Sequence, residues 1–157
     1  MRKIMLVKTK HFGEIELEDS KIITFDEGLI GFEDKKRYTI LFNNESKSKT
    51  KGTISWLQSL DEPQLALPVV SPFVAMADYN PIVEDEVLAP LGELNDENLV
   101  ILLTLTVPSD LTKMTVNLKA PIIINADTRK GCQAIAENPD YVVRYGIYKD
   151  LKEIKGE

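Results

Sequence analysis

Residues Asn117 to Gln133 read NLKAPIIINADTRKGCQ, and this stretch decides the fold. Ile122 to Asn125 is predicted to be a strand, and Gly131 to Ile135 is predicted to pair back on it. Between them, Asn125 to Gly131 combines Asn, Asp and Gly, which are residues typical of turns. A phosphate-binding Walker loop would need the pattern GxxxxGK[ST], but here Lys130 precedes the glycine and no glycine lies upstream within reach. The stretch therefore favours a β-hairpin over a phosphate site.

Short strand-like segments separated by turn residues recur along the rest of the chain. Pro68 has no amide hydrogen, so its strand is expected to be edge-like or bulged. Val83 to Leu91 is the best helix candidate, with acids near its start and Pro90 as its expected end. The pattern predicts an all-β fold, a small antiparallel β-barrel or sandwich with one or two short helices. The other predicted strands are Ile4 to Thr9, Glu14 to Glu18, Ile22 to Phe25, Arg37 to Phe42, Thr53 to Leu60, Leu65 to Ser71, Leu99 to Val107 and Met114 to Leu118.

Length and composition predict one β-rich domain over residues 1–148, followed by a tail or short helix over 149–157. The polar, lysine-rich segment 43–52 is expected to be a hairpin tip. Apolar runs are far shorter than the roughly 18 residues of a membrane span, and the N-terminus lacks a signal-peptide pattern. One cysteine cannot form an internal disulfide, so we expect a cytoplasmic protein. We also expect the free protein to be a monomer.

Charge is distributed unevenly along the chain. Residues 52–112 contain ten acidic residues and no lysine or arginine, whereas the flanking segments 1–51 and 113–157 each carry a net charge of +2. If these acids share a face, their field attracts a basic partner and repels phosphates. The simpler alternative is a solvated acidic surface that keeps the protein soluble.

The sequence offers few groups for catalysis. Cys132 would need a nearby base to become a reactive thiolate, and the only histidine is His11, in a predicted surface turn. One Cys and one His fall short of a zinc site, and neither cofactor loops nor metal-binding motifs occur. An acid/base pair of carboxylates stays open as an alternative. We expect no enzyme activity, no cofactor and no metal.

A basic run, Lys35 to Tyr38, together with the lysines of residues 47–51, raises the alternative of direct nucleic-acid binding. A small-molecule-binding β-barrel is a further alternative. The run is short, it follows two acids, and the protein is acidic, so a solvated surface is favoured.

Aromatic residues and methionine lie among the acids of the cation-free segment. Such a mixture is typical of a protein interface, although each large apolar residue taken singly is more often core. The predicted partner-binding residues are Phe73, Asp78, Tyr79, Glu84, Asp85 and Glu86.

Several of these segments, in order, resemble one family of bacterial proteins, the flagellar assembly factor FliW. The similarity covers about residues 4–145. Ser71-Pro72 departs from it, because the family often has Asn-Pro there. The segments are Gly28 to Glu33 (GLIGFE), Trp56 to Ser59 (WLQS) with Pro63 and Leu65 to Leu67, Thr106 to Pro108, Asn117 to Asn125 (NLKAPIIIN), Gln133 and Tyr141.

The resemblance implies a small β-barrel-like protein without catalytic activity. Members bind flagellin and the RNA-binding translational repressor CsrA, and binding relieves the repression of flagellin translation. When flagellin is exported, the released family member captures CsrA and translation resumes. We therefore expect two protein partners, a CsrA-type regulator and flagellin, with no direct contact to nucleic acid or membrane.

Overall fold

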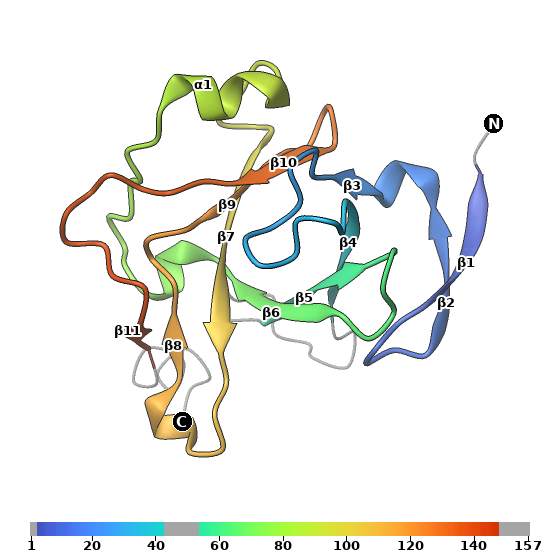
Figure 1. Cartoon of the computed structure of the whole chain (residues 1–157), viewed down its shortest axis with the longest axis horizontal. Helices are drawn as coiled ribbons and strands as arrows, with labels where there is room; N and C mark the ends of the chain where they lie inside the picture. The colour runs from blue at the N-terminus through green and yellow to red at the C-terminus, as the bar shows by residue number, and fades with distance from the viewer. Residues whose placement is uncertain (1–2, 43–53, 148–157) are drawn as a thin grey trace.

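The computed structural model describes residues 3–42 and 54–147 (Figure 1). The predicted hairpin tip over 43–52 and the C-terminal segment 149–157 lie outside the described residues. Among the described residues, one α-helix, α1 (Asp85–Leu88), and four short 3₁₀ turns accompany the strands. The turns are η1 (Asp19–Lys21), η2 (Pro72–Val74), η3 (Ala89–Leu91) and η4 (Leu111–Lys113). The strands are β1 (Ile4–Lys8), β2 (Glu14–Glu18), β3 (Ile23–Thr24), β4 (Arg37–Phe42), β5 (Ser55–Ser59), β6 (Ala66–Val70), β7 (Leu99–Thr106), β8 (Thr115–Val116), β9 (Ile122–Asn125), β10 (Lys130–Gln133) and β11 (Tyr145–Gly146).

Seven strands close into a barrel. They pair in the order β7-β6-β5-β4-β3-β10-β9, and β9 pairs back with β7. Every pairing is antiparallel except that of β3 with β10, which is parallel. Closure leaves no free sheet edge within the ring, which removes sites for unwanted strand pairing. The prediction of an all-β, barrel-like fold is confirmed.

Residues 122–133 form the β9–β10 hairpin. Lys130 pairs with Asn125 across the turn, and the amide of Arg129 donates to the Asn125 carbonyl oxygen at 2.8 Å. The Asn125 side-chain oxygen accepts from the amides of Asp127 and Thr128, at 2.9 and 3.2 Å. Arg129 has a left-handed backbone, with φ of 59°. The hairpin prediction is confirmed, and asparagine is what organises the turn.

The isoleucines of β9 are buried on both faces of the sheet. Ile122 and Ile124 point into the barrel, where they pack in a cluster with Phe25 and Leu57. Ile123 points outward and packs against Leu91 in a cluster under α1 and η3. A continuous apolar run, rather than an alternating one, is what a strand covered on both sides requires.

A second core covers the outer face of β6 and β7. Leu103 and Val116 pack there against residues of the η2 region and of the late segment 134–147, among them Tyr79 and Tyr141. These two tyrosine rings stack with centroids 4.8 Å apart. The irregular segments are therefore held on the barrel by apolar burial as well as by hydrogen bonds.

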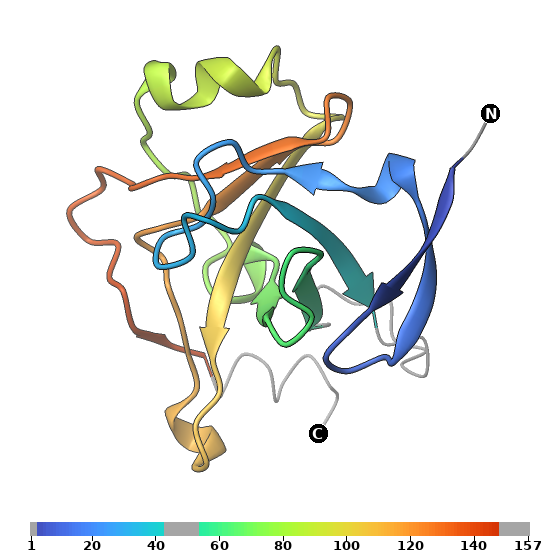
Figure 2. The ribbon, with the colours of Figure 1, turned by 45° about the vertical axis from the view of Figure 1, so that its right-hand side comes forward.

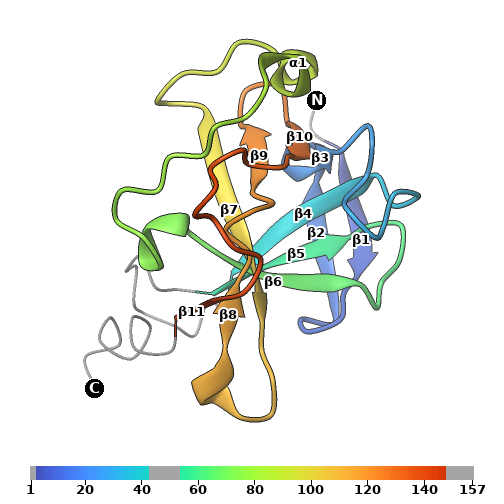
Figure 3. The same cartoon turned by 60° about the vertical axis from the view of Figure 1, so that its left-hand side comes forward.

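The β1–β2 hairpin forms a separate two-stranded sheet beside the barrel (Figure 2). At the other extreme of the molecule, the hairpin that joins β7 to β8 extends away from α1, as Figure 3 shows. The molecule thus has three distinct surface regions: the α1 side, the β1–β2 hairpin and the β7–β8 hairpin.

β6 lies between β5 and β7, but it is edge-like at Pro68, as predicted. Pro68 pairs with Trp56 of β5, and the ladder to β7 begins only at Val69, so the missing amide hydrogen costs no ladder bond to β7. The helix prediction differs from the structure, because α1 ends two residues before Pro90 and continues as the 3₁₀ turn η3.

Candidate functional site

A groove on the outside of the barrel lies between α1 and the loop that follows β3. It consists of two adjoining depressions of about 420 and 460 Å³, which share Val87 and Gln133. We call them together the acidic groove. The first depression is lined by Asp26, Glu27, Gly28, Leu29, Ile30, Glu33, Glu86, Val87, Pro90, Leu91, Gly131, Cys132 and Gln133, and the second by Glu84, Val87, Gln133, Ala134, Ile135 and Glu137.

One wall, which we call the loop wall, is formed by residues 26–33. Gly28 has φ of +67°, and its amide donates to the Phe25 carbonyl at 2.8 Å. A Cβ at Gly28 would lie 2.6 Å from the backbone of Glu33, so the turn requires glycine. Leu29 is buried in the barrel cluster, whereas Ile30 is 53% exposed. The loop therefore fixes itself with one apolar side chain and presents the next one to the groove.

The opposite wall is α1 with η3. Glu84 precedes the first helical turn and Asp85 and Glu86 lie in it, where the helix dipole favours negative charge. Leu91 is buried against the outer face of β9, which seats this wall on the barrel. Val87 is partly exposed and faces both depressions.

Gln133 of β10 connects the loop to the barrel. Its side-chain oxygen accepts from the Ile30 amide at 2.9 Å, and its side-chain nitrogen donates to the Ala120 carbonyl at 3.0 Å. The Gly31 amide in turn donates to the Glu33 carboxylate at 2.9 Å. These contacts hold the exposed loop in one position, which fixes the width of the groove.

Negative charge dominates the rim of the acidic groove. No lysine or arginine contributes to its described lining. Just outside it, Lys130 lies 3.8 Å from the Asp26 carboxylate, and both side chains are about half exposed, so this pair neutralises little. Carboxylates from both walls form the rim: Asp26, Glu27, Glu33, Glu84, Glu86 and Glu137.

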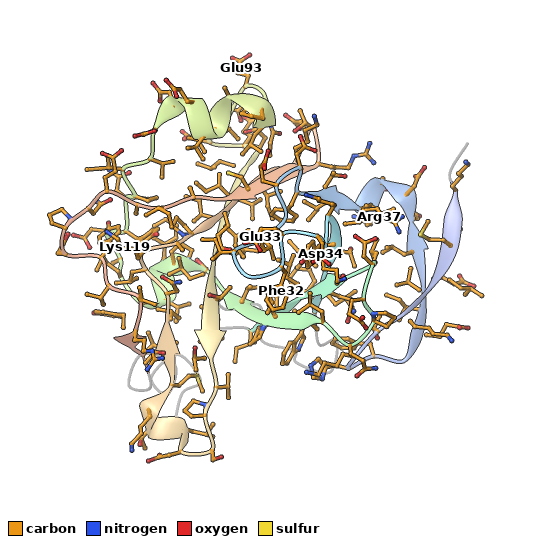
Figure 4. The ribbon with its side chains drawn as sticks, viewed as in Figure 1. Phe32, Glu33, Asp34, Arg37, Glu93 and Lys119 are labelled. Atoms are coloured by element: carbon orange, nitrogen blue, oxygen red, sulfur yellow. The ribbon has the colours of Figure 1, made fainter. Side chains whose placement is uncertain are left out.

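The acids of residues 52–112 do not form the single face that the sequence analysis considers. Glu93 lies beside α1, whereas Asp61 accepts from the side chain of Arg37 in another part of the molecule (Figure 4). Asp110 caps η4 in the distant β7–β8 hairpin. Part of the cation-free segment is therefore structural. The acidic groove instead combines α1 with carboxylates of the N-terminal segment.

Asp61 is one acid of residues 52–112 that has a structural role, because its carboxylate accepts several local hydrogen bonds. Burial raises its pKa, but hydrogen bonds from the Lys36 amide, the Arg37 amide and the Arg37 guanidinium outweigh burial and lower the pKa overall. The neighbouring Lys35 lies 3.1 Å from Asp34. Lys35 and Arg37 are thus paired with nearby acids, and the Lys36 ammonium donates to the Asp26 carbonyl at 3.0 Å, which does not favour a nucleic-acid surface.

The predicted partner-binding residues fall into two groups. Glu84, Asp85 and Glu86 are exposed on the α1 side, whereas Phe73 and Asp78 are exposed around η2. Figure 1 shows η2 and α1 as separate parts of the surface.

Tyr79 lies in the core rather than on the surface. It is 5% exposed, stacks on Tyr141 and donates to the Leu118 carbonyl at 2.8 Å. Burial raises the pKa of the Tyr79 hydroxyl, with a further contribution from Tyr141. An aromatic residue among acids was a poor indicator of exposure here, so we leave Tyr79 out of the proposed surface.

Cys132 and His11 lie in different environments. The His11 ring packs against Trp56 in a tilted arrangement, with centroids 4.0 Å apart, and burial together with Lys10 lowers the pKa of His11. Cys132 is half-buried in the acidic groove, and burial raises the pKa of its thiol. The thiol therefore lacks the histidine partner that the sequence analysis considers for an activated nucleophile.

Within residues 3–42 and 54–147, no group of three or more His, Cys, Asp or Glu side chains is arranged to hold a metal ion. In the same part of the chain, no helix is long and apolar enough to cross a membrane.

Sequence reasoning missed the N-terminal wall of the groove. Asp26, Glu27 and Glu33 belong to a segment of net positive charge, so charge counting alone gave no signal for them. The only available signal was the pair of glycines between these acids, which predicts a loop but not what it faces.

These features define a class: a closed, small β-barrel with an apolar, acid-rimmed groove on its outer surface. The family model described as "FliW protein" matches residues 6–147. The chain therefore belongs to the FliW family of flagellar assembly factors.

Individual relatives agree with this assignment. The flagellar assembly factor FliW of Lachnoclostridium phytofermentans is 59% identical over 148 residues, which cover 94% of each chain. That of Lachnospira eligens is 54% identical over 150 residues, covering 95% of this chain and 98% of the relative. A crystal structure of the flagellar assembly factor FliW superposes with a TM-score of 0.80 at 29% identity, covering 91% of this chain and 96% of that one.

Proposed function

We propose that this protein regulates flagellin synthesis by binding two proteins, a CsrA-type RNA-binding repressor of translation and flagellin. Membership of a family of flagellar assembly factors supports the flagellar role. The exchange of partners follows the family resemblance: flagellin occupies the protein until it is exported, and the freed protein then removes the repressor. This cycle takes place in the cytoplasm, where flagellin is translated.

The acidic groove is the observation that carries the repressor-binding part of the proposal. RNA-binding proteins present lysine and arginine to phosphates, so their binding surfaces complement a rim of carboxylates. Opposite charges also steer the two proteins together and make association fast and salt-sensitive. A negative surface placed over the repressor disfavours RNA at the same time.

We propose a binding role rather than a catalytic one. Cys132 is the nucleophile that the sequence raises as a candidate, but its thiol has a raised pKa, and His11, the only histidine of the chain, packs against Trp56 instead. A Cys132→Ala variant is expected to retain full regulatory activity in a motility assay. Loss of regulation in a variant that remains folded and still binds both partners would indicate chemistry at the thiol.

Charge reversal on α1 tests the proposal. A variant with Glu84, Asp85 and Glu86 changed to lysine is expected to bind a CsrA-type protein about tenfold or more weakly at low salt, as measured by titration calorimetry. A matched variant reverses three exposed acids away from α1, namely Glu14, Glu16 and Glu62, and is expected to bind almost normally. Equal weakening by both variants, or unchanged affinity in the first, would contradict docking on the α1 side.

The exchange of partners needs its own measurement. Flagellin added to the preformed complex with the CsrA-type protein is expected to release that protein, as followed by size-exclusion chromatography. A stable complex of all three proteins would contradict the proposed exchange.

A further inference from the structure

We propose that the acidic groove binds one amphipathic, basic segment of a partner chain, with apolar side chains on the groove floor and lysines or arginines against both walls. This inference deepens the proposed function and rests on it only for the identity of the natural partner. It adds the site, which spans two segments of the chain, and the chemistry of the occupant.

The apolar lining of the groove is open to solvent. Ile30 is 53% exposed, Ile135 is 54% exposed and Val87 is 38% exposed, and all three line the two adjoining depressions. Pro90 and the half-buried Cys132 add further apolar surface in the first depression. Each depression is large enough to receive anchoring side chains, and two adjoining depressions can accept apolar side chains repeated along one segment.

The rim determines which apolar segment fits. Glu27 stands on the loop wall and Glu86 on the helix wall, and both are exposed. Within residues 3–42 and 54–147, neither carboxylate makes a hydrogen bond or an ion pair, so both are available to a ligand. Without a cation in the described lining, an acidic or phosphate-bearing occupant would be repelled from both sides.

The groove is also preorganised in the free protein. Gln133 fixes the Ile30 amide at 2.9 Å, and Gly28 sets the turn that presents Ile30. A preorganised wall lowers the entropy cost of binding, which favours a short segment as ligand. The loop wall therefore holds its side of the groove in place, which positions it for the segment that binds against α1.

A synthetic peptide tests the inference without the natural partner. The probe is a fluorescein-labelled helix of about 18 residues, with leucine at every third or fourth position and lysine elsewhere; its control has glutamate in place of lysine. Fluorescence anisotropy is expected to show binding of the lysine peptide that weakens strongly between about 50 and 500 mM salt. The glutamate peptide is expected not to bind. Binding of both peptides or of neither would overturn the inference.

Variants locate the peptide. Glu27→Lys combined with Glu86→Lys is expected to weaken the lysine peptide about tenfold or more, whereas Glu16→Lys with Glu14→Lys, the same charge change on the β1–β2 hairpin, is expected to change affinity less than about threefold. Ile30→Ser tests the apolar lining, with Leu6→Ser as its control, because Leu6 is 67% exposed on the β1–β2 hairpin. Equal effects of test and control variants would overturn the groove as the site.

Chemical modification of Cys132 distinguishes a failure of the inference from a failure of the proposed function. It is the only cysteine of the chain, so modification by N-ethylmaleimide, followed by intact mass, reports on the groove floor. A bound CsrA-type protein is expected to slow this modification about fivefold or more. Tight binding with an unchanged rate would overturn the groove but leave the proposed function intact. Protection by the peptide without any binding of the CsrA-type protein would support the groove as a binding site and contradict the proposed function.

Discussion

Two hollows on the same barrel differ in charge, although both have apolar floors. The acidic groove is rimmed by carboxylates. The second hollow, which we call the barrel mouth, measures about 220 Å³ and is lined by Ile23, Ile40, Phe42, Val100 and Ile124 together with the cations Lys21 and Arg129. Apolar surface alone therefore does not identify a binding site here, and the charge of the rim distinguishes what each hollow could accept.

The two hollows also differ in what supports them. The barrel mouth is part of the barrel itself, since its apolar residues continue the interior cluster. The acidic groove depends on a single loop and a single helical turn laid on the outside of the barrel. Its walls should therefore respond to local substitutions that leave the barrel folded.

The largest effect is expected at Gly28. Gly28→Ala forces a Cβ to within 2.6 Å of the Glu33 backbone at a positive φ, so the free energy of unfolding should fall by about 2–3 kcal/mol and the loop wall should shift. Gly31→Ala is the control, since Gly31 also has a positive φ but its Cβ would meet nothing within 4 Å; about 1 kcal/mol is expected there. Denaturant unfolding gives both values. Equal losses would show that the close approach at Gly28 is unimportant.

Gln133→Ala should have the next largest effect, and a local one. It removes the acceptor of the Ile30 amide and the donor to the Ala120 carbonyl, for a loss of about 1–2 kcal/mol. The Ile30 amide hydrogen should exchange with solvent much faster, while the amides of β4 beside the barrel mouth should be unaffected. Uniformly faster exchange across the barrel would contradict the separate support of the groove.

Asp61 should produce a smaller effect that depends on pH. Its pKa is lowered in the folded protein, so its contribution to stability is present above the unfolded value of about 3.9 and is lost as pH falls through the folded pKa. Asp61→Asn should cost about 1 kcal/mol or less at neutral pH and make stability less dependent on pH below about 4, since the carboxylate is partly exposed. Thermal unfolding across this pH range measures the difference. An identical pH profile for the variant would contradict the assignment.

The smallest effect at neutral pH is expected for Tyr38, in the cluster beneath the barrel mouth. Its ring is buried against Phe25, and its hydroxyl has no hydrogen-bond partner among the described residues. Tyr38→Phe should therefore change stability by less than about 1 kcal/mol at neutral pH.

Tyr38 also predicts a difference in stability between Tyr38→Phe and the parent protein at alkaline pH. Burial, with Asp61 and Asp34, raises the pKa of Tyr38 to about 12. The folded state favours the neutral phenol. The contribution of Tyr38 to the free energy of unfolding is therefore complete below the unfolded pKa of about 10 and is lost as pH rises toward 12. Unfolding of Tyr38→Phe should be less sensitive to pH in this interval than that of the parent protein. A destabilisation of the variant at neutral pH would reveal a partner for the hydroxyl.

Local chemistry in the sequence was sufficient for the elements but not for the groove. Asn125 to Gly131 predicts its turn because Asn, Asp and Gly act within a few residues of each other. The acidic groove joins Glu27 to Glu86, which come together only when β3 pairs with β10 and β9 pairs with β7. No local pattern encodes these long-range pairings, and for the same reason Tyr79 could not be recognised as core.

Hydrogen–deuterium exchange of the complex with a CsrA-type protein tests the central claim most directly, because it maps the contact surface over the whole chain. Docking in the acidic groove predicts protection on complex formation of residues 26–33, 84–91 and 131–135, with no change at 20–24 and 39–42 around the barrel mouth. Protection confined to the barrel mouth or to η2, with the groove segments exchanging as in the free protein, would contradict it.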